Sequence, residues 1–126
     1  MISSEIADNI APVVIIEPYQ NIVRSVNSLA TIFTTPSDKD FYLTSAILSV
    51  AKDAAATGTS VTITAIIDGV TQTIVAVAGI TLTANAQTVN EQCYVKIDRN
   101  TAIAISGANW TVYRGIIKGF TVEVTR

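Results

Sequence analysis

The sequence predicts an all-β domain, an antiparallel, jelly-roll-like β-sandwich of seven to nine short strands. Three observations support this prediction: short β-branched and aromatic runs recur at regular spacing, turn residues separate them, and no stretch shows the apolar period of an amphipathic helix. A parallel α/β fold would need crossover helices between its strands. We find no segment that could supply them.

The clearest local signal is Asp68-Gly69, which lies between two runs of alternating apolar and polar residues. This dipeptide favours a two-residue type I′ turn, whose central residues both need a positive φ. Extending the register from that turn pairs Ile63 with Ile74. We therefore expect a β-hairpin with one apolar face and one Thr-rich face.

The other expected strands differ in how cleanly they alternate. They cover residues 31–35, 41–50, 80–83, 94–98, 102–106 and 110–125. In the 41–50 strand, strict alternation places Tyr42 on one face with Ala46 and Leu48. In the closing strand we expect Phe120 and Val122 to point to the core.

Residues 1–28 differ from the rest of the chain. They hold two of the three prolines, and between these lies the apolar run Val13, Val14, Ile15 and Ile16. Because proline disfavours central strands, we interpret 1–28 as an attachment arm with an edge strand, and 29–126 as the sandwich domain. The alternative is that the segment is an ordinary first strand of the same sandwich.

Charged residues make up only 14% of the 126 residues, against about a quarter in typical proteins. So few charges leave neutral or apolar surface patches, which commonly mark interfaces. We therefore expect a homo-oligomer or a subunit docked on a larger assembly. The alternative is a monomer with a Thr-rich surface.

Several partners are not expected. The net charge is −2 and the cations are scattered, so nucleic acid is not an expected partner. The uncharged run 69–90 holds too many polar residues to span a membrane. The start of the chain lacks the basic region of a signal peptide.

Catalytic and metal-binding residues are also not expected. The chain has no histidine, which excludes Ser-His-Asp and Cys-His arrangements and imidazole zinc sites. The single cysteine, Cys93, fits a buried free thiol. Asp38 and Asp40 offer a weak calcium alternative, weakened by the intervening Lys39. We predict a non-enzymatic protein without cofactor or metal.

Aromatic residues provide the candidate ligand site. Tyr42, Tyr94, Trp110 and Tyr113 could form a platform for a sugar, and Trp110 and Tyr113 are the candidate pair because Trp110 follows a Gly-Ala-Asn turn. The alternative for Trp110 is packing in the core, which is commoner for a lone tryptophan at a strand start.

The segment from Thr35 to Ala46 reads Thr-Pro-Ser-Asp-Lys-Asp-Phe-Tyr-Leu-Thr-Ser-Ala. It resembles a sequence motif of small β-sandwich proteins in tailed bacteriophage particles, in which a Thr-Pro turn leads through a polar loop into an aromatic strand. The Asp68-Gly69 hairpin and the closing strand are similar in character. The resemblance covers about residues 31–125, and it brings no shared site residues.

The resemblance implies a virion structural module: a capsid decoration, head-fibre or tail-associated protein. Because such modules are often trimeric, the resemblance also favours a homotrimer. Such a module would be assembled in the host cytoplasm, and its partners would be its own copies and other virion proteins. The main alternative is a glycan- or receptor-binding β-sandwich module that binds a host surface glycan. A third hypothesis is a minor subunit of a bacterial surface or secretion assembly.

Overall fold

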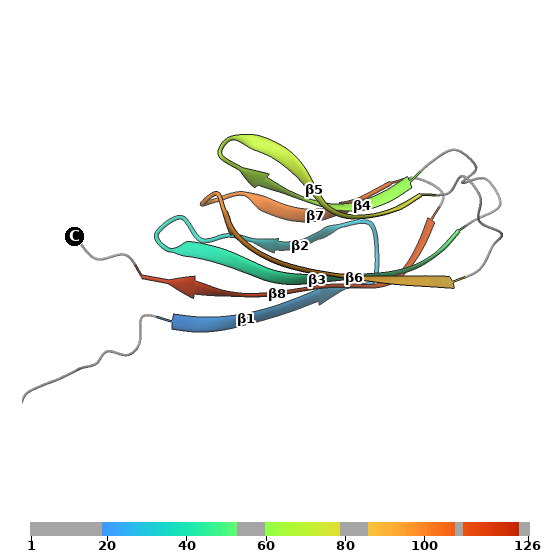
Figure 1. Cartoon of the computed structure of the whole chain (residues 1–126), viewed down its shortest axis with the longest axis horizontal. Helices are drawn as coiled ribbons and strands as arrows, with labels where there is room; N and C mark the ends of the chain where they lie inside the picture. The colour runs from blue at the N-terminus through green and yellow to red at the C-terminus, as the bar shows by residue number, and fades with distance from the viewer. Residues whose placement is uncertain (1–18, 53–59, 79–85, 108–109, 124–126) are drawn as a thin grey trace, which may run out of the picture.

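The computed structural model describes residues 19–52, 60–78, 86–107 and 110–123. This part of the chain is all-β, with two stacked layers of strands (Figure 1). Its eight strands are β1 (Tyr19–Val26), β2 (Thr31–Thr34), β3 (Asp40–Lys52), β4 (Ser60–Ile67), β5 (Val70–Ala78), β6 (Ala86–Ile97), β7 (Ala102–Ser106) and β8 (Trp110–Val122). The predicted fold class is confirmed, although β3, β6 and β8 are longer than the short strands expected.

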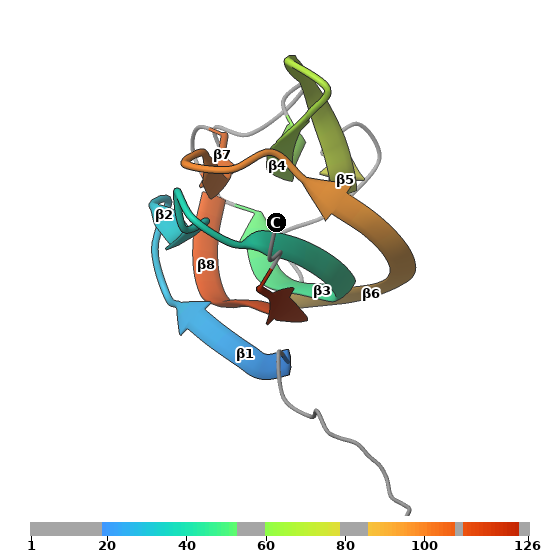
Figure 2. The same ribbon diagram turned by 90° about the vertical axis from the view of Figure 1, so that its left-hand side faces the viewer.

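Each layer is a four-stranded antiparallel sheet, and the two do not close into a barrel. The first sheet has the order β1-β8-β3-β6 and the second has the order β2-β7-β4-β5. Strands that are consecutive in the chain mostly lie in different sheets, as in an eight-stranded jelly roll. Figure 2 shows the layers from one end, with β6 curving from the edge of the first sheet towards β5.

The predicted hairpin is present, with a different register beyond its tip. Asp68 and Gly69 have φ values of 52° and 79°, as a type I′ turn requires. A β-bulge then places Ile63 opposite Val75, so the predicted pairing of Ile63 with Ile74 is wrong. The bulge changes the alternation of β5 and turns Val75 and Val77 into the core.

A second bulge, at Thr44, decides which side chains of β3 are buried. The pairing with β8 shifts between Leu43 and Ser45, which leaves Thr44 as the extra residue. Apolar side chains on both sides of the bulge are fully buried: Phe41, Leu43, Ala46, Leu48 and Val50. The expectation that Tyr42 shares a face with Ala46 is therefore wrong, because alternation does not continue through a bulge.

The closing strand β8 faces the opposite way from the prediction. Ile117 and Thr121 are buried, whereas Phe120 and Val122 are only half-buried. Gly119 explains this orientation, because a Cβ at this position would meet the ring of Phe41 and the backbone oxygen of Tyr42. The large ring of Phe41 thus fills the space that a side chain at 119 would occupy.

The N-terminal strand β1 is an edge strand of the first sheet. It pairs with β8 over its whole length, from Tyr19 opposite Val122 to Val26 opposite Gly115. Residues 19–26 of the expected arm are therefore part of the sandwich. The attachment candidates Val13, Val14, Ile15 and Ile16, and the strand expected at 80–83, lie outside the described residues.

Candidate functional site

Four aromatic rings cross the outer face of the first sheet, the face turned away from the second sheet. They are Tyr19 on β1, Phe120 on β8, Tyr42 on β3 and Tyr94 on β6. Neighbouring ring centroids lie 5.5, 5.3 and 5.6 Å apart, and the rings of Phe120, Tyr42 and Tyr94 are stacked. We call these four residues the aromatic ladder.

Strand register brings the ladder together. Tyr42 lies directly opposite Phe120, whereas Tyr19 and Tyr94 reach their neighbours diagonally. The bulge at Thr44 contributes, because it lets Tyr42 point outwards while both halves of β3 bury their apolar residues. Sequence positions that span about a hundred residues thereby form one continuous cluster, in which the ring centroids of Tyr94 and Phe120 are also only 6.2 Å apart.

The two ends of the ladder are its exposed parts. The side chains of Tyr19 and Tyr94 are 68% and 71% exposed, whereas Tyr42 and Phe120 between them are half-buried. The inner rings therefore act as supports that hold the end rings in fixed orientations. Each end ring keeps most of its surface open to solvent.

Two lysines flank the ladder on the same face. Lys96 lies directly opposite Tyr42, and Lys118 lies two residues before Phe120. Both are exposed, and in the described part of the chain neither forms an ion pair. Two ammonium groups therefore stand beside the rings without a carboxylate partner.

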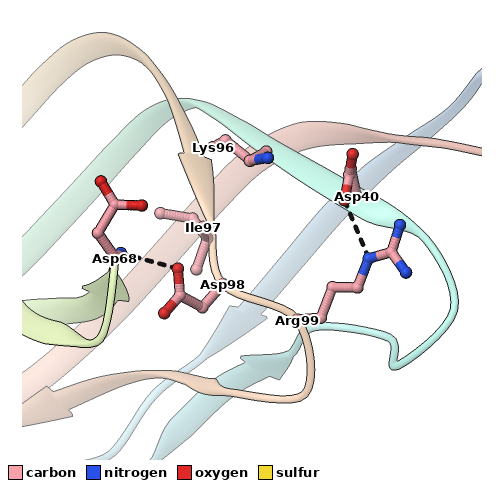
Figure 3. Close-up of a pocket in the computed structure, with 6 residues that line it drawn as sticks. All are labelled: Asp40, Asp68, Lys96, Ile97, Asp98 and Arg99. Carbon is pink, nitrogen blue, oxygen red and sulfur yellow. Dashed lines mark hydrogen bonds and ion pairs between the residues drawn. The ribbon is translucent and has the colours of Figure 1, made fainter. Parts of the chain in front are cut away.

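A shallow open depression of about 420 Å³ adjoins the ladder at Lys96 (Figure 3). Its lining residues are Asp40, Asp68, Lys96, Ile97, Asp98 and Arg99. Asp98 accepts hydrogen bonds from the backbone amides of Asp68 and Gly69, and Asp40 pairs with Arg99 at 2.9 Å. Two of its three carboxylates are thus already engaged within the protein.

The two aspartates considered for calcium are each paired with a cation of the protein. Asp38 contacts Lys39 at 3.8 Å, and Asp40 is paired with Arg99. Among the described residues no group of three or more acidic, histidine or cysteine side chains could hold a metal ion. The same residues contain no helix with the length and apolarity needed to cross a membrane.

The predicted platform residues separate in the structure. Trp110 is only 7% exposed and belongs to the core, so it offers no open ring to a ligand. Tyr113 is 53% exposed, but it lies seven residues from Phe120 along β8, about 23 Å away. Tyr42 and Tyr94, also considered, do stack together.

Sequence reasoning missed Tyr19 and Phe120 as members of the site. Tyr19 was assigned to the attachment arm, and Phe120 was expected in the core. Alternation alone could not place either residue, since the order of strands in the sheet decides which rings become neighbours.

Cys93 lies on β6 next to the ladder but is half-buried. Its thiol contacts the backbone oxygen of Leu43, with the sulfur 3.6 Å from that oxygen. Burial raises the pKa of the Cys93 thiol, and the nearby carboxylate of Glu91 raises it further. The thiol form is therefore favoured, as expected for an unreactive cysteine.

Comparison with protein families, with curated proteins and with solved structures finds no match to this chain.

Proposed function

We propose that the protein is a non-enzymatic β-sandwich module of a virus particle that attaches to surface carbohydrate through the aromatic ladder. The observation that carries this proposal is the exposure of the end rings, 68% for Tyr19 and 71% for Tyr94. Exposed aromatic rings are typical of contact surfaces. Tyr19 contacts Phe120 edge-on and Tyr94 stacks on Tyr42, so these contacts already restrict the two side chains and reduce the side-chain entropy lost on binding.

Carbohydrate suits the geometry of this surface. One face of a pyranose ring consists of C–H groups, which pack against the electron-rich face of an aromatic ring. The ladder crosses four strands on an open sheet face, so an extended sugar chain can lie along it with its hydroxyl groups in water. A small drug-like ligand would instead need a concave pocket.

Two lines of support favour a virus particle. The jelly-roll strand order recurs in viral capsid proteins and in lectin domains, which is an analogy at the level of fold. The segment 35–46 resembles small proteins of bacteriophage particles. In this proposal the module is assembled in the host cytoplasm with other virion proteins and then displayed on the particle.

A panel of immobilised neutral and acidic glycans tests the attachment function. We expect the unmodified protein to bind members of the panel and the double variant Tyr19→Ser with Tyr94→Ser to lose that binding. Tyr113→Ser is the matched control, because Tyr113 is also an exposed tyrosine of the first sheet. Binding to no glycan, or undiminished binding by the double variant, would contradict the proposal.

Self-association is a second candidate function, favoured by exposed apolar residues outside the ladder. Val23 and Tyr113, 57% and 53% exposed, lie on strands of the first sheet, and they are typical of surface that becomes covered in an assembly. In the favoured trimer the contacts are heterologous, so this face packs on a different surface of the neighbouring copy.

Native mass by light scattering over a range of concentrations tests self-association. We expect a stable trimer that Val23→Lys dissociates. Val70→Lys is the comparison, because Val70 is 55% exposed on the second sheet. An unchanged mass would place the second contact surface elsewhere, and dissociation would place it at Val70. A monomer at all concentrations would remove this candidate and leave the attachment function unaffected.

A further inference from the structure

The outer face of the first sheet differs in charge from the chain as a whole. Register and exposure place Lys96, Lys118 and Arg114 on this face, in a chain whose net charge is −2. Asp40 is the acid that the register adds to the same face, and Arg99 already neutralises it at 2.9 Å. Over the described strands of the first sheet, cations therefore outnumber acids on this face, and the further carboxylates near it, Asp68 and Asp98, line the depression beside Lys96.

We infer that the aromatic ladder binds an acidic oligosaccharide, a chain of sugars that carry carboxylate, sulfate or phosphate groups. The end rings pack against the sugars, and Lys96 and Lys118 pair with the anionic groups. This inference rests on the attachment function proposed above and names its substrate class.

The position of the lysines favours an anion over a neutral sugar. Lys96 faces Tyr42 across the strands, and Lys118 shares its side of β8 with Phe120. To a neutral sugar these ammonium groups offer only hydrogen bonds to hydroxyl groups, which compete with hydrogen bonds to water. An anionic sugar gains ion pairs at the ends of its stacking contacts, and the charges also raise its association rate.

The width of the ladder indicates an oligosaccharide. Its rings come from four adjacent strands, and the two end rings lie on different sides of Phe120, with the ring centroid of Tyr19 at 5.5 Å and that of Tyr94 at 6.2 Å from the Phe120 centroid. A single sugar ring reaches only one or two neighbouring aromatic rings. A chain of sugars can contact Tyr19 and Tyr94 at the same time, which joins weak contacts into one binding event.

Two other anionic or apolar partners fit less well. Single-stranded nucleic acid also stacks on aromatic rings, but it needs a basic groove along its backbone, and this face offers only scattered cations. A second copy that used the same face across a two-fold axis would bring together two copies of a surface on which cations outnumber acids. Nucleic acid is one of the outcomes of the experiment below, and a second copy is tested by the native mass described above.

The experiment uses matched acidic and neutral carbohydrates with the full chain. Titration calorimetry compares short galacturonate oligomers with their neutral methyl esters, and dextran sulfate with dextran, so that carboxylate and sulfate are separate arms. We expect the acidic member of at least one pair to bind about tenfold more tightly than its neutral match, from two ion pairs. Raising the salt concentration should remove that preference.

Variants assign the preference to the ladder. Lys96→Gln and Lys118→Gln should each weaken binding of the acidic oligomer about two- to fivefold, as expected for exposed ion pairs. Arg114→Gln is the control, because it removes the same charge from β8 about 20 Å from Phe120. It should leave the affinity unchanged, and a loss equal to that of Lys96→Gln would overturn the assignment to the ladder.

The outcomes separate this inference from the attachment function. Equal affinity for acidic and neutral matches, lost in the Tyr19→Ser with Tyr94→Ser variant, would overturn the acidic preference and keep carbohydrate attachment. No binding of any carbohydrate would overturn both. Tighter binding of oligo-dT than of every acidic sugar, with the same dependence on Lys96, would replace the inference with nucleic-acid binding.

Discussion

The carboxylate of Asp98 holds the turn at Gly69. Its Oδ2 accepts a hydrogen bond from the backbone amide of Gly69 at 2.8 Å, and its Oδ1 accepts one from the amide of Asp68 at the same distance. The backbone amide of Asp98 in turn donates to the oxygen of Ile66 at 2.9 Å. The end of β6 is thereby tied to the tip of the β4–β5 hairpin, across the two sheets.

Asp98→Asn should therefore weaken the fold. The asparagine amide keeps one acceptor oxygen, so one turn amide loses its partner, and we expect the free energy of unfolding to fall by about 1–3 kcal/mol. Denaturant titration measures this. Asp38→Asn is the control, since the Asp38 side chain is 74% exposed and only loosely paired. Equal midpoints for the two variants would show that the Asp98 contacts contribute nothing.

Two buried threonines should respond in opposite ways to the same substitution. Thr121 is 4% exposed, and its Oγ1 has no hydrogen-bond partner among the described residues. Thr35 is 1% exposed, but its Oγ1 donates to the backbone oxygen of Asp98 at 2.6 Å and accepts from the amide of Thr101 at 2.9 Å. Comparing the two threonines therefore distinguishes the cost of burying a hydroxyl group from the stabilisation that its hydrogen bonds provide.

Thr121→Val should raise the free energy of unfolding by about 1 kcal/mol, because it removes an unsatisfied buried hydroxyl. Thr35→Val should lower it by about 1–3 kcal/mol, because two partners lose their hydrogen bonds. Thermal and denaturant unfolding measure both changes. A loss of stability in Thr121→Val would mean that this hydroxyl is satisfied in solution.

Gly115 and Ile105 form a pair that a double-mutant cycle can test. A Cβ at Gly115 would contact the Cδ1 and Cγ1 atoms of Ile105, so Gly115→Ala should destabilise the fold by about 1–3 kcal/mol. Ile105→Val removes Cδ1 and should recover part of this loss when the two changes are combined. Strictly additive effects would contradict a direct contact between the two positions.

The Cys93 thiol should ionise at a higher pH in the folded protein than in the unfolded chain. Burial is the main cause of the raised pKa, and the Glu91 carboxylate adds to it. The resulting stabilisation is present below the pKa of the unfolded chain and is lost as the pH rises through the folded value. The pH profile of alkylation by iodoacetamide, with and without denaturant, measures the shift.

Glu91→Gln should move that alkylation profile to lower pH while leaving the fold intact, because it removes only the smaller of the two causes. Identical profiles for folded and unfolded protein would contradict the burial of the thiol.

The sequence was sufficient for the fold class and for the hairpin, but insufficient for the faces of β3 and β8. The Asp68-Gly69 turn depends on local φ preferences, which the dipeptide itself carries. The face of Tyr42 depends on the bulge at Thr44, and one extra residue reverses every side chain beyond it. No local sequence pattern predicts where such a bulge occurs.

Predicting the aromatic ladder would have required the order of the strands in the sheet, which local sequence patterns do not contain. Tyr42 and Tyr94 were candidates from their aromatic character alone, whereas Tyr19 and Phe120 became neighbours only through the strand order β1-β8-β3. Trp110 shows the reverse error, since its position after a turn suggested exposure while the strand buries it. Long-range register, rather than composition, decides which rings meet.

Chemical-shift mapping by NMR tests most directly whether the aromatic ladder is the contact surface. Isotope-labelled protein is titrated with short galacturonate oligomers and with dextran sulfate, and the amide shifts are followed residue by residue. We predict that the largest changes fall at Tyr19, Tyr42, Tyr94 and Phe120, and at the neighbouring Lys96. Shift changes confined to β4 and β5, with the ladder residues unaffected, would contradict the claim that the aromatic ladder is the contact surface.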